Sequence, residues 1–216
     1  MFKIRTLNNI SETGLARLPE EHYSISGDAE DPDAILVRSH QLTLEDVSSS
    51  LRAVGRAGAG VNNIPVSDYT DRGVVVFNTP GANANAVKEL VMVGLLLSCR
   101  GIIPGIDYVN SLESHTDKAE LNKLVEASKK QYKGRELKGK TLGVLGLGAI
   151  GSMVADMALQ MEMEVVGFDP ALSVEAAWRL SSRVQRMENM QSLFSRSDIV
   201  TLHVPALDST RGMIND

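Results

Sequence analysis

The sequence predicts an α/β protein built on two parallel β-sheets. In residues 1–80, short runs of β-branched and apolar residues alternate with helix-like segments, which is typical of parallel βαβ units. Later in the chain, the strand-like run 141–145 leads directly into a glycine-rich loop and then into a helical run. A second strand-like run, 165–168, follows that helix. The later part of the chain therefore also predicts a βαβ unit.

The composition is that of a globular protein and disfavours several functional classes. The 216 residues are 43% hydrophobic and 23% charged, as in ordinary globular proteins, and the formal net charge of −5 disfavours nucleic-acid binding. The single cysteine, Cys99, can form neither an intramolecular disulfide nor a structural zinc site, so we expect a reducing, cytoplasmic location and no metal site. The N-terminus lacks the apolar segment of a signal peptide, and no apolar run approaches the roughly 20 residues needed to span a bilayer.

Four strands are expected in the first part of the chain, each a short run of β-branched and apolar residues. A helix is expected over 11–18 and another from Thr43, because Ser and Thr are common N-caps. Ligands of parallel α/β sheets bind at the carboxyl ends of strands, so the loops after Val37, Arg56 and Asn78 are candidate binding loops. The expected strands lie at 2–6, 34–38, 53–56 and 74–78.

A long apolar helix is expected over 84–102. Gly101 and Pro104 interrupt the apolar run at its end, which favours a domain boundary there. A surface helix with one buried face is expected over 119–132, because apolar residues recur there at helical spacing with charges opposite. The two predicted domains are 1–100, a substrate-binding domain, and 101–216, an incomplete dinucleotide-binding domain.

The loop 146–151 has the pattern Gly-x-Gly-x-x-Gly between a strand and a helix. Gly146 permits a tight turn, Gly148 lets the backbone approach a pyrophosphate, and Gly151 lets the helix pack closely on the strand. The helix N-terminus then faces the anion with its partial positive charge. Asp169 ends the next strand, at the offset expected for the carboxylate that accepts the ribose hydroxyls of NAD. The combination predicts a Rossmann-type dinucleotide-binding domain.

Asp169 also bears on the choice of cofactor. Its carboxylate repels the 2′-phosphate of NADP, and residues 170–173 contain no Arg or Lys, so NAD is predicted over NADP. His203 lies at the end of a later predicted strand. We interpret it as hydrogen-bonded structure rather than as a catalytic base, because a base needs a positioned partner that spacing does not show.

Five segments, with the glycine loop, carry a family resemblance: Val37-Arg38-Ser39, GRAGAGVNNI at 55–64, NTPGANANAVKEL at 78–90, GKTLG at 139–143 and TRGMIN at 210–215. They resemble the D-isomer-specific 2-hydroxyacid dehydrogenases over essentially the whole chain, and most closely the members that oxidise D-3-phosphoglycerate. The resemblance implies a flavodoxin-like parallel-sheet substrate domain, a Rossmann domain, NAD, and a phosphorylated 2-hydroxy acid as substrate. It also implies a homodimer or homotetramer joined through the dinucleotide domains.

The same resemblance implies which residues bind ligands. Small residues after the third expected strand leave backbone N–H groups free to hold the substrate carboxylate, and arginines suit a phosphate. The implied substrate-binding residues are Arg38, Ser39, Arg56, Gly58, Ala59, Gly60, Val61 and Asn83. The cofactor-binding residues are Gly146, Gly148, Ala149, Ile150, Gly151, Asp169, Val204 and Pro205.

The family's catalytic Arg, Glu and His follow a strand later than Asp216. The resemblance therefore implies no catalytic residue among the 216, and we expect the chain alone to be inactive. The whole enzyme is expected to oxidise D-3-phosphoglycerate to 3-phosphohydroxypyruvate with NAD, the entry step of serine synthesis. Two alternatives stay open: a dehydrogenase or reductase of another D-2-hydroxy acid, of the glyoxylate or hydroxypyruvate type, and a non-catalytic NAD-binding module.

Overall fold

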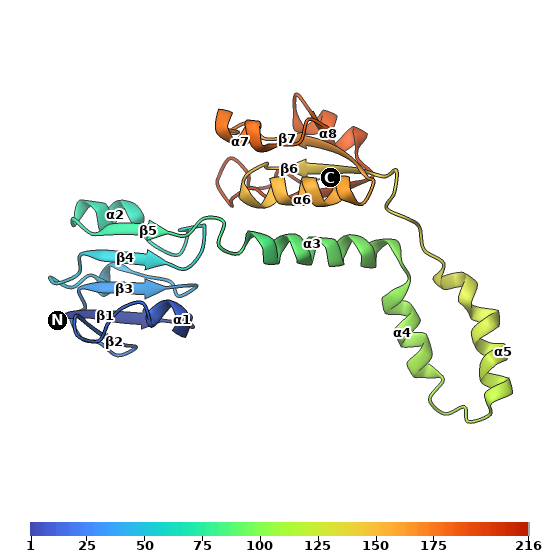
Figure 1. Cartoon of the computed structure of the whole chain (residues 1–216), viewed down its shortest axis with the longest axis horizontal. Coiled ribbons are helices and arrows are strands. Elements are labelled where there is room, and N and C mark those ends of the chain that lie inside the picture. Colours follow the sequence, from blue (N-terminus) through green and yellow to red (C-terminus); the bar gives the residue numbers. More distant parts are fainter. Residues whose placement is uncertain (216) are drawn as a thin grey trace. The chain divides into compact units, whose positions relative to one another are not determined.

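The computed structural model describes residues 1–215, without the side chain of Glu175. By its internal contacts the chain divides into two compact units, Met1–Asn83 and a second from Ala84 onward. Each unit is built on a parallel sheet with helices, so the predicted α/β fold class is confirmed (Figure 1).

The first unit contains a five-stranded parallel sheet in the order β2-β1-β3-β4-β5 (Figure 1). This is the flavodoxin-like order, in which ligands bind outside the carboxyl ends of the strands. The four predicted strands are present, and the strand that was not predicted, β2, pairs with β1 at one edge. The strands are β1 (Phe2–Leu7), β2 (Tyr23–Ser26), β3 (Ala34–Val37), β4 (Ala53–Arg56) and β5 (Val75–Asn78).

The helices of the first unit are short. The helix expected over 11–18 is the single turn α1 (Glu12–Leu15), and the one expected from Thr43 is a 3₁₀ turn at Leu44–Asp46. Thr43 caps that turn, since its Oγ1 accepts a hydrogen bond from the Glu45 N–H. A further helix, α2 (Val66–Asp71), precedes β5. The core of the unit is formed by Ile35, Val37, Leu42, Leu51, Val54, Ile64, Tyr69 and Val74.

The second unit contains a four-stranded parallel sheet in the order β8-β7-β6-β9. It matches the first four strands of the six-stranded Rossmann order, in which the first strand lies next to the fourth. The strands are β6 (Thr141–Leu145), β7 (Glu164–Phe168), β8 (Val184–Arg186) and β9 (Ile199–Leu202). The helices are α3 (Ala84–Cys99), α4 (Ile102–Ser111), α5 (Lys118–Ser128), α6 (Ala149–Gln160), α7 (Val174–Arg179) and α8 (Met190–Arg196).

Helix α3 lies beside α6 and belongs by its contacts to the second unit (Figure 1). The division therefore falls before this helix, whereas we expected it after the helix. The physical reason is that Leu95 packs into the buried cluster around Leu142 and Val144. The expected helix over 84–102 ends at Cys99, and Pro104 lies in the first turn of α4, where its missing N–H leaves no helical hydrogen bond unmade. The functional roles of the two units stay predictions.

Helices α4 and α5 form a hairpin, and a 3₁₀ turn at Lys129–Tyr132 follows α5 (Figure 1). Tyr108 ties the hairpin together, because its Oη donates to the Leu124 carbonyl at 3.0 Å and accepts from Ser128 Oγ at 2.7 Å. The helix expected over 119–132 is present as α5 and the 3₁₀ turn, and the face expected to be buried is half-buried at Leu121, Leu124, Ser128 and Tyr132 and exposed at Val125. Within the described chain, no single helix is long and apolar enough to span a membrane, and α3 and α4 would suffice only together across a 64° bend.

Candidate dinucleotide and substrate sites

The glycine loop connects β6 to α6 and is held in one shape by close backbone contacts. Gly146 has φ +90°, in the left-handed region that favours glycine, and a Cβ there would lie 2.6 Å from the His203 carbonyl oxygen. A Cβ on Gly151 would overlap the Gly146 carbonyl group. These two glycines therefore let strand, loop and helix approach more closely than any other residue would allow.

Gly148 has a different environment. A Cβ there would meet no atom of the described chain within 4 Å, and both Gly148 and Ala149 are exposed. Gly148 is also the N-cap of α6, and no side chain caps the helix. The N–H groups of the first turn thus lack intrahelical partners, and the space beside Gly148 is open. An uncapped helix start with an open glycine fits a dinucleotide pyrophosphate, and Ile150, which is half-buried, lies in the same first turn.

Asp169 follows the end of β7 and is fixed by two backbone hydrogen bonds. Its Oδ2 accepts from the Leu147 N–H at 2.8 Å, and its Oδ1 accepts from the Ala171 N–H at 2.9 Å. Each carboxylate oxygen keeps acceptor capacity for a further donor. The residue is half-buried and lines a cavity of about 750 Å³. A pinned, partly exposed carboxylate next to the glycine loop fits the predicted contact with ribose hydroxyls.

The loop after β9 lies beside the glycine loop. Its His203 N–H donates to the Leu145 carbonyl at 2.8 Å, and Val204 Cγ1 would lie 3.0 Å from a Cβ on Gly146. His203 Nε2 is hydrogen-bonded to Thr201 Oγ1 at 3.0 Å, and burial lowers the pKa of the imidazole, which favours its neutral form. These contacts agree with the structural interpretation of His203. Val204 is half-buried and Pro205 is exposed.

In the first unit, the two candidate arginines lie at the carboxyl edge of the sheet on neighbouring strands. Arg56 ends β4 and pairs in register with Val37, and Arg38 follows Val37 directly. None of the ion pairs between described residues involves either arginine. Arg56 Nε is buried without a hydrogen-bond partner in the described chain. Two cations without acidic partners at this edge are suited to an anionic ligand.

The loop after Arg56 folds over its guanidinium. A Cβ on Gly58 would lie 2.8 Å from Arg56 Cζ, so any larger residue would displace the guanidinium, and the Gly58 φ of +156° also favours glycine. The loop is held to the end of β5, because the Gly58 N–H donates to Thr79 Oγ1 at 2.8 Å and Asn78 Nδ2 donates to the Ala59 carbonyl at 2.7 Å. The structure thus brings together most of the predicted substrate residues of this loop: Arg56, Gly58, Ala59, Gly60 and Val61.

One positioning residue was not predicted. Asn8 follows β1 with φ 67°, and its Oδ1 accepts from the Ser39 N–H at 3.0 Å. It therefore fixes the loop that carries Arg38 and Ser39. The available signal was the Asn8-Asn9 pair directly after a predicted strand, since asparagine tolerates the left-handed conformation. The remaining candidate, Asn83, is exposed in the turn that ends the first unit.

Comparison with known proteins agrees with this geometry. Residues 106–216 match the family model described as "D-isomer specific 2-hydroxyacid dehydrogenase, NAD binding domain". The chain belongs to this family. The predicted family and the predicted cofactor NAD are thereby confirmed, since the matched domain is the NAD-binding one.

Individual relatives agree on the family and differ in name. The chain is 38% identical over 187 residues to D-3-phosphoglycerate dehydrogenase of Methanocaldococcus jannaschii, covering 85% of this chain and 33% of that protein. It is 37% identical over 192 residues to hydroxypyruvate reductase of Thermotoga maritima, covering 85% of this chain and 55% of that protein. The NAD⁺-bound 3-phosphoglycerate dehydrogenase of Entamoeba histolytica superposes with a TM-score of 0.71 at 24% identity, covering 99% of this chain and 66% of that chain, which supports the fold.

Proposed function

We propose that this protein is a cytoplasmic enzyme that oxidises D-3-phosphoglycerate to 3-phosphohydroxypyruvate. The observation that carries the proposal is the pair Arg38 and Arg56, two cations without acidic partners at the carboxyl edge of the first sheet. A substrate with both a carboxylate and a phosphate needs such positive charge, and the planar guanidinium can bind either group through two hydrogen bonds. Relatives named D-3-phosphoglycerate dehydrogenase support the same assignment.

Each unit contributes residues with separate roles. When bound, NAD accepts the hydride that the hydroxy acid loses. The uncapped start of α6 at Gly148 binds the pyrophosphate, and Asp169 accepts hydrogen bonds from the ribose. Arg38 and the loop held by Thr79 bind the substrate's anionic groups. We assign no acid–base residue among the described residues, because His203 is half-buried and hydrogen-bonded to Thr201.

A second candidate, oxidation or reduction of an unphosphorylated D-2-hydroxy acid, is favoured by the similarity to the hydroxypyruvate reductase. Binding of 3-phosphoglycerate and of glycerate to this chain, measured by calorimetry with NADH present, separates the two. Arg38→Ala should lower the affinity for 3-phosphoglycerate about 10- to 100-fold and the affinity for glycerate far less, because a charge-assisted hydrogen bond contributes about 1.5–3 kcal/mol. The matched control is Arg52→Ala, an exposed arginine just before β4 at the other edge of the sheet. Equal losses for both ligands would favour the unphosphorylated acid.

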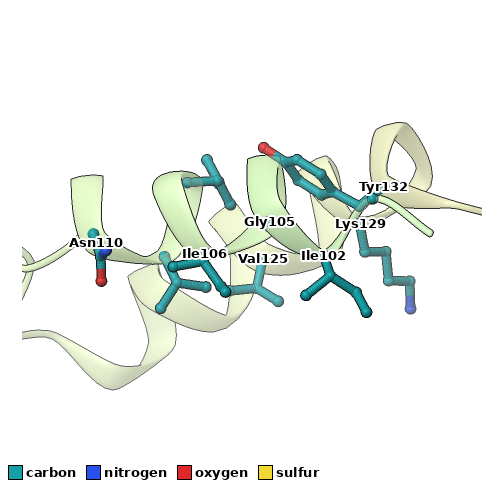
Figure 2. Close-up of a pocket in the computed structure, with 10 residues that line it drawn as sticks. Ile102, Gly105, Ile106, Asn110, Val125, Lys129 and Tyr132 are labelled. Atoms are coloured by element: carbon teal, nitrogen blue, oxygen red, sulfur yellow. The ribbon is translucent and has the colours of Figure 1, made fainter. Parts of the chain in front are cut away.

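We also propose that the protein is a homodimer or homotetramer joined through the second unit, with the α4–α5 face as an interface. Ile102, Ile106 and Val125 lie side by side on this face (Figure 2). Ile106 is 51% exposed and Val109 is 62% exposed. Lys129 is the one charged side chain among the described residues that line the hollow. A second copy would present the same nearly uncharged surface, so the two faces can cover one another without charge repulsion.

The oligomer is tested by sedimentation of the purified chain. Ile106→Glu places a charge in the apolar face and should convert the oligomer to monomers over the micromolar range. Asn122→Glu is the matched control, because it adds the same charge at an exposed position of α5 outside the hollow. A monomeric wild-type chain, or an oligomer that is unchanged by Ile106→Glu, would exclude this face as the interface.

A further inference from the structure

The cavity beside Asp169 contains a second charged residue, Arg186, at the end of the neighbouring strand. β7 and β8 pair in parallel, with Gly167 opposite Arg186. Residues two apart on a strand share a face, so Gly167 and Asp169 face the same side as Val184 and Arg186. All four line the cavity of about 750 Å³. The fold therefore brings together an acidic and a basic residue that are 17 positions apart in the sequence.

Two charged residues, one acidic and one basic, lie among the described residues of this cavity. Asp169 and Arg186 are the two charged residues among the described side chains that line it, and the remainder of the lining is apolar, serine or glycine. Arg186 is exposed and takes part in none of the ion pairs between described residues. The Asp169 carboxylate accepts instead from two backbone N–H groups. The guanidinium is thus available to another anion at the same end of the sheet.

We infer that Arg186 binds the 2′-phosphate of a phosphorylated nicotinamide dinucleotide and so determines how strongly the site discriminates against NADP. The inference rests on the proposed ribose-binding role of Asp169. With the ribose at Asp169, a 2′-phosphate is repelled by that carboxylate and attracted by the guanidinium on the neighbouring strand, whose geometry suits phosphate. The site therefore prefers NAD because of Asp169, and retains measurable affinity for NADP because of Arg186.

The test measures dissociation constants of NADH and NADPH for the full chain by cofactor fluorescence. Arg186→Gln should raise the dissociation constant of NADPH at least tenfold more than that of NADH. Arg183→Gln is the matched control, because Arg183 is an exposed arginine just before β8 that does not line the cavity, and its variant should change the ratio less than twofold. Asp169→Asn should lower the affinity for NADH and raise the affinity for NADPH. In the double variant with Arg186→Gln, the affinity for NADPH should no longer exceed that of the wild type. Circular dichroism melting checks that each variant folds.

The outcomes separate the inference from the proposal on which it rests. If Asp169→Asn weakens NADH but Arg186→Gln leaves the ratio of the two affinities unchanged, the ribose contact stands and the role of Arg186 is refuted. If Asp169→Asn leaves NADH binding unchanged, both the ribose contact and the role of Arg186 are refuted. A selective loss of NADPH affinity in Arg186→Gln that Arg183→Gln does not show, and that becomes smaller at high salt, supports the inference.

Discussion

A comparison of two alanine substitutions in the glycine loop tests how the loop is built. A Cβ on Gly151 would overlap the Gly146 carbonyl oxygen and lie 2.9 Å from the carbonyl carbon and 3.3 Å from Val144 Cγ1. Backbone atoms cannot rotate away from the new methyl group, so the start of α6 must move outward. Overpacking of a core costs about 1–3 kcal/mol and sometimes more, and we expect Gly151→Ala to lower the free energy of unfolding by about 3 kcal/mol.

Gly148→Ala is the matched substitution in open space. Its Cβ would meet no described atom within 4 Å, and its φ of −69° suits any residue, so the free energy of unfolding should fall by less than about 1 kcal/mol. The same methyl group occupies the open face in front of the α6 N–H groups, where the pyrophosphate is proposed to bind. Gly148→Ala should therefore weaken NADH at least about tenfold while the chain stays folded, since removing a charge-assisted hydrogen bond has an effect of this order.

Urea unfolding followed by circular dichroism measures the first effect, and NADH fluorescence titration measures the second. For Gly151→Ala, a loss of about 3 kcal/mol corresponds to a decrease of about 1–3 M in the urea midpoint. Equal midpoints for the two variants would refute the close approach at Gly151. Unchanged NADH affinity in Gly148→Ala would refute the proposed position of the pyrophosphate.

Three further predictions concern stability. Because burial lowers the pKa of His203, the unfolded chain binds a proton more readily than the folded chain. The contribution of His203 to the free energy of unfolding is therefore fully present above about pH 6.5 and is lost as the pH falls through the lowered pKa. Urea midpoints at pH 7.5 and 5.5 should differ more for the wild type than for His203→Gln. Thr79→Val removes one of two acceptors of the Gly58 N–H and the hydrogen bond that Thr79 Oγ1 donates to the Arg56 carbonyl, and should lower the free energy of unfolding of the first unit by about 1–2 kcal/mol, measured by urea unfolding. Tyr108→Phe should destabilise the α4–α5 hairpin by a similar amount, seen as faster amide exchange there.

Local sequence patterns were sufficient to predict the elements that sit at the ligand-binding edges. Short β-branched runs marked β1, β3, β4 and β5, and the glycine pattern with Asp169 marked the turn between β6 and α6 and the end of β7. These features depend on residues close together in the sequence. The strand β2 was not predicted because Tyr23–Ser26 has only four residues, two of them apolar, so its alternation is at the lower limit of a strand signal.

Features that depend on distant residues could not be predicted from one sequence. The place of α3 in the second unit depends on Leu95 meeting the core around Leu142, more than forty residues later. The contact from Asn8 to Ser39 joins two loops across the sheet, and the position of Arg186 beside Asp169 follows from strand register. Register and sheet order are properties of the folded chain, so a local signal such as the Asn8-Asn9 pair marks a turn but not its distant partner.

The membership of α3 in the second unit bears on how such a protein can be divided and recombined. Leu95 is 5% exposed because it completes the core beneath β6 and α6. A crossover between Asn83 and Ala84 would transfer that core intact to a different partner domain. A crossover after Cys99 would leave part of it behind and expose the apolar side of α6 to water. The turn before α3 is therefore the point at which gene fusion can exchange the first unit, the proposed substrate-binding one, while the core of the second unit stays complete.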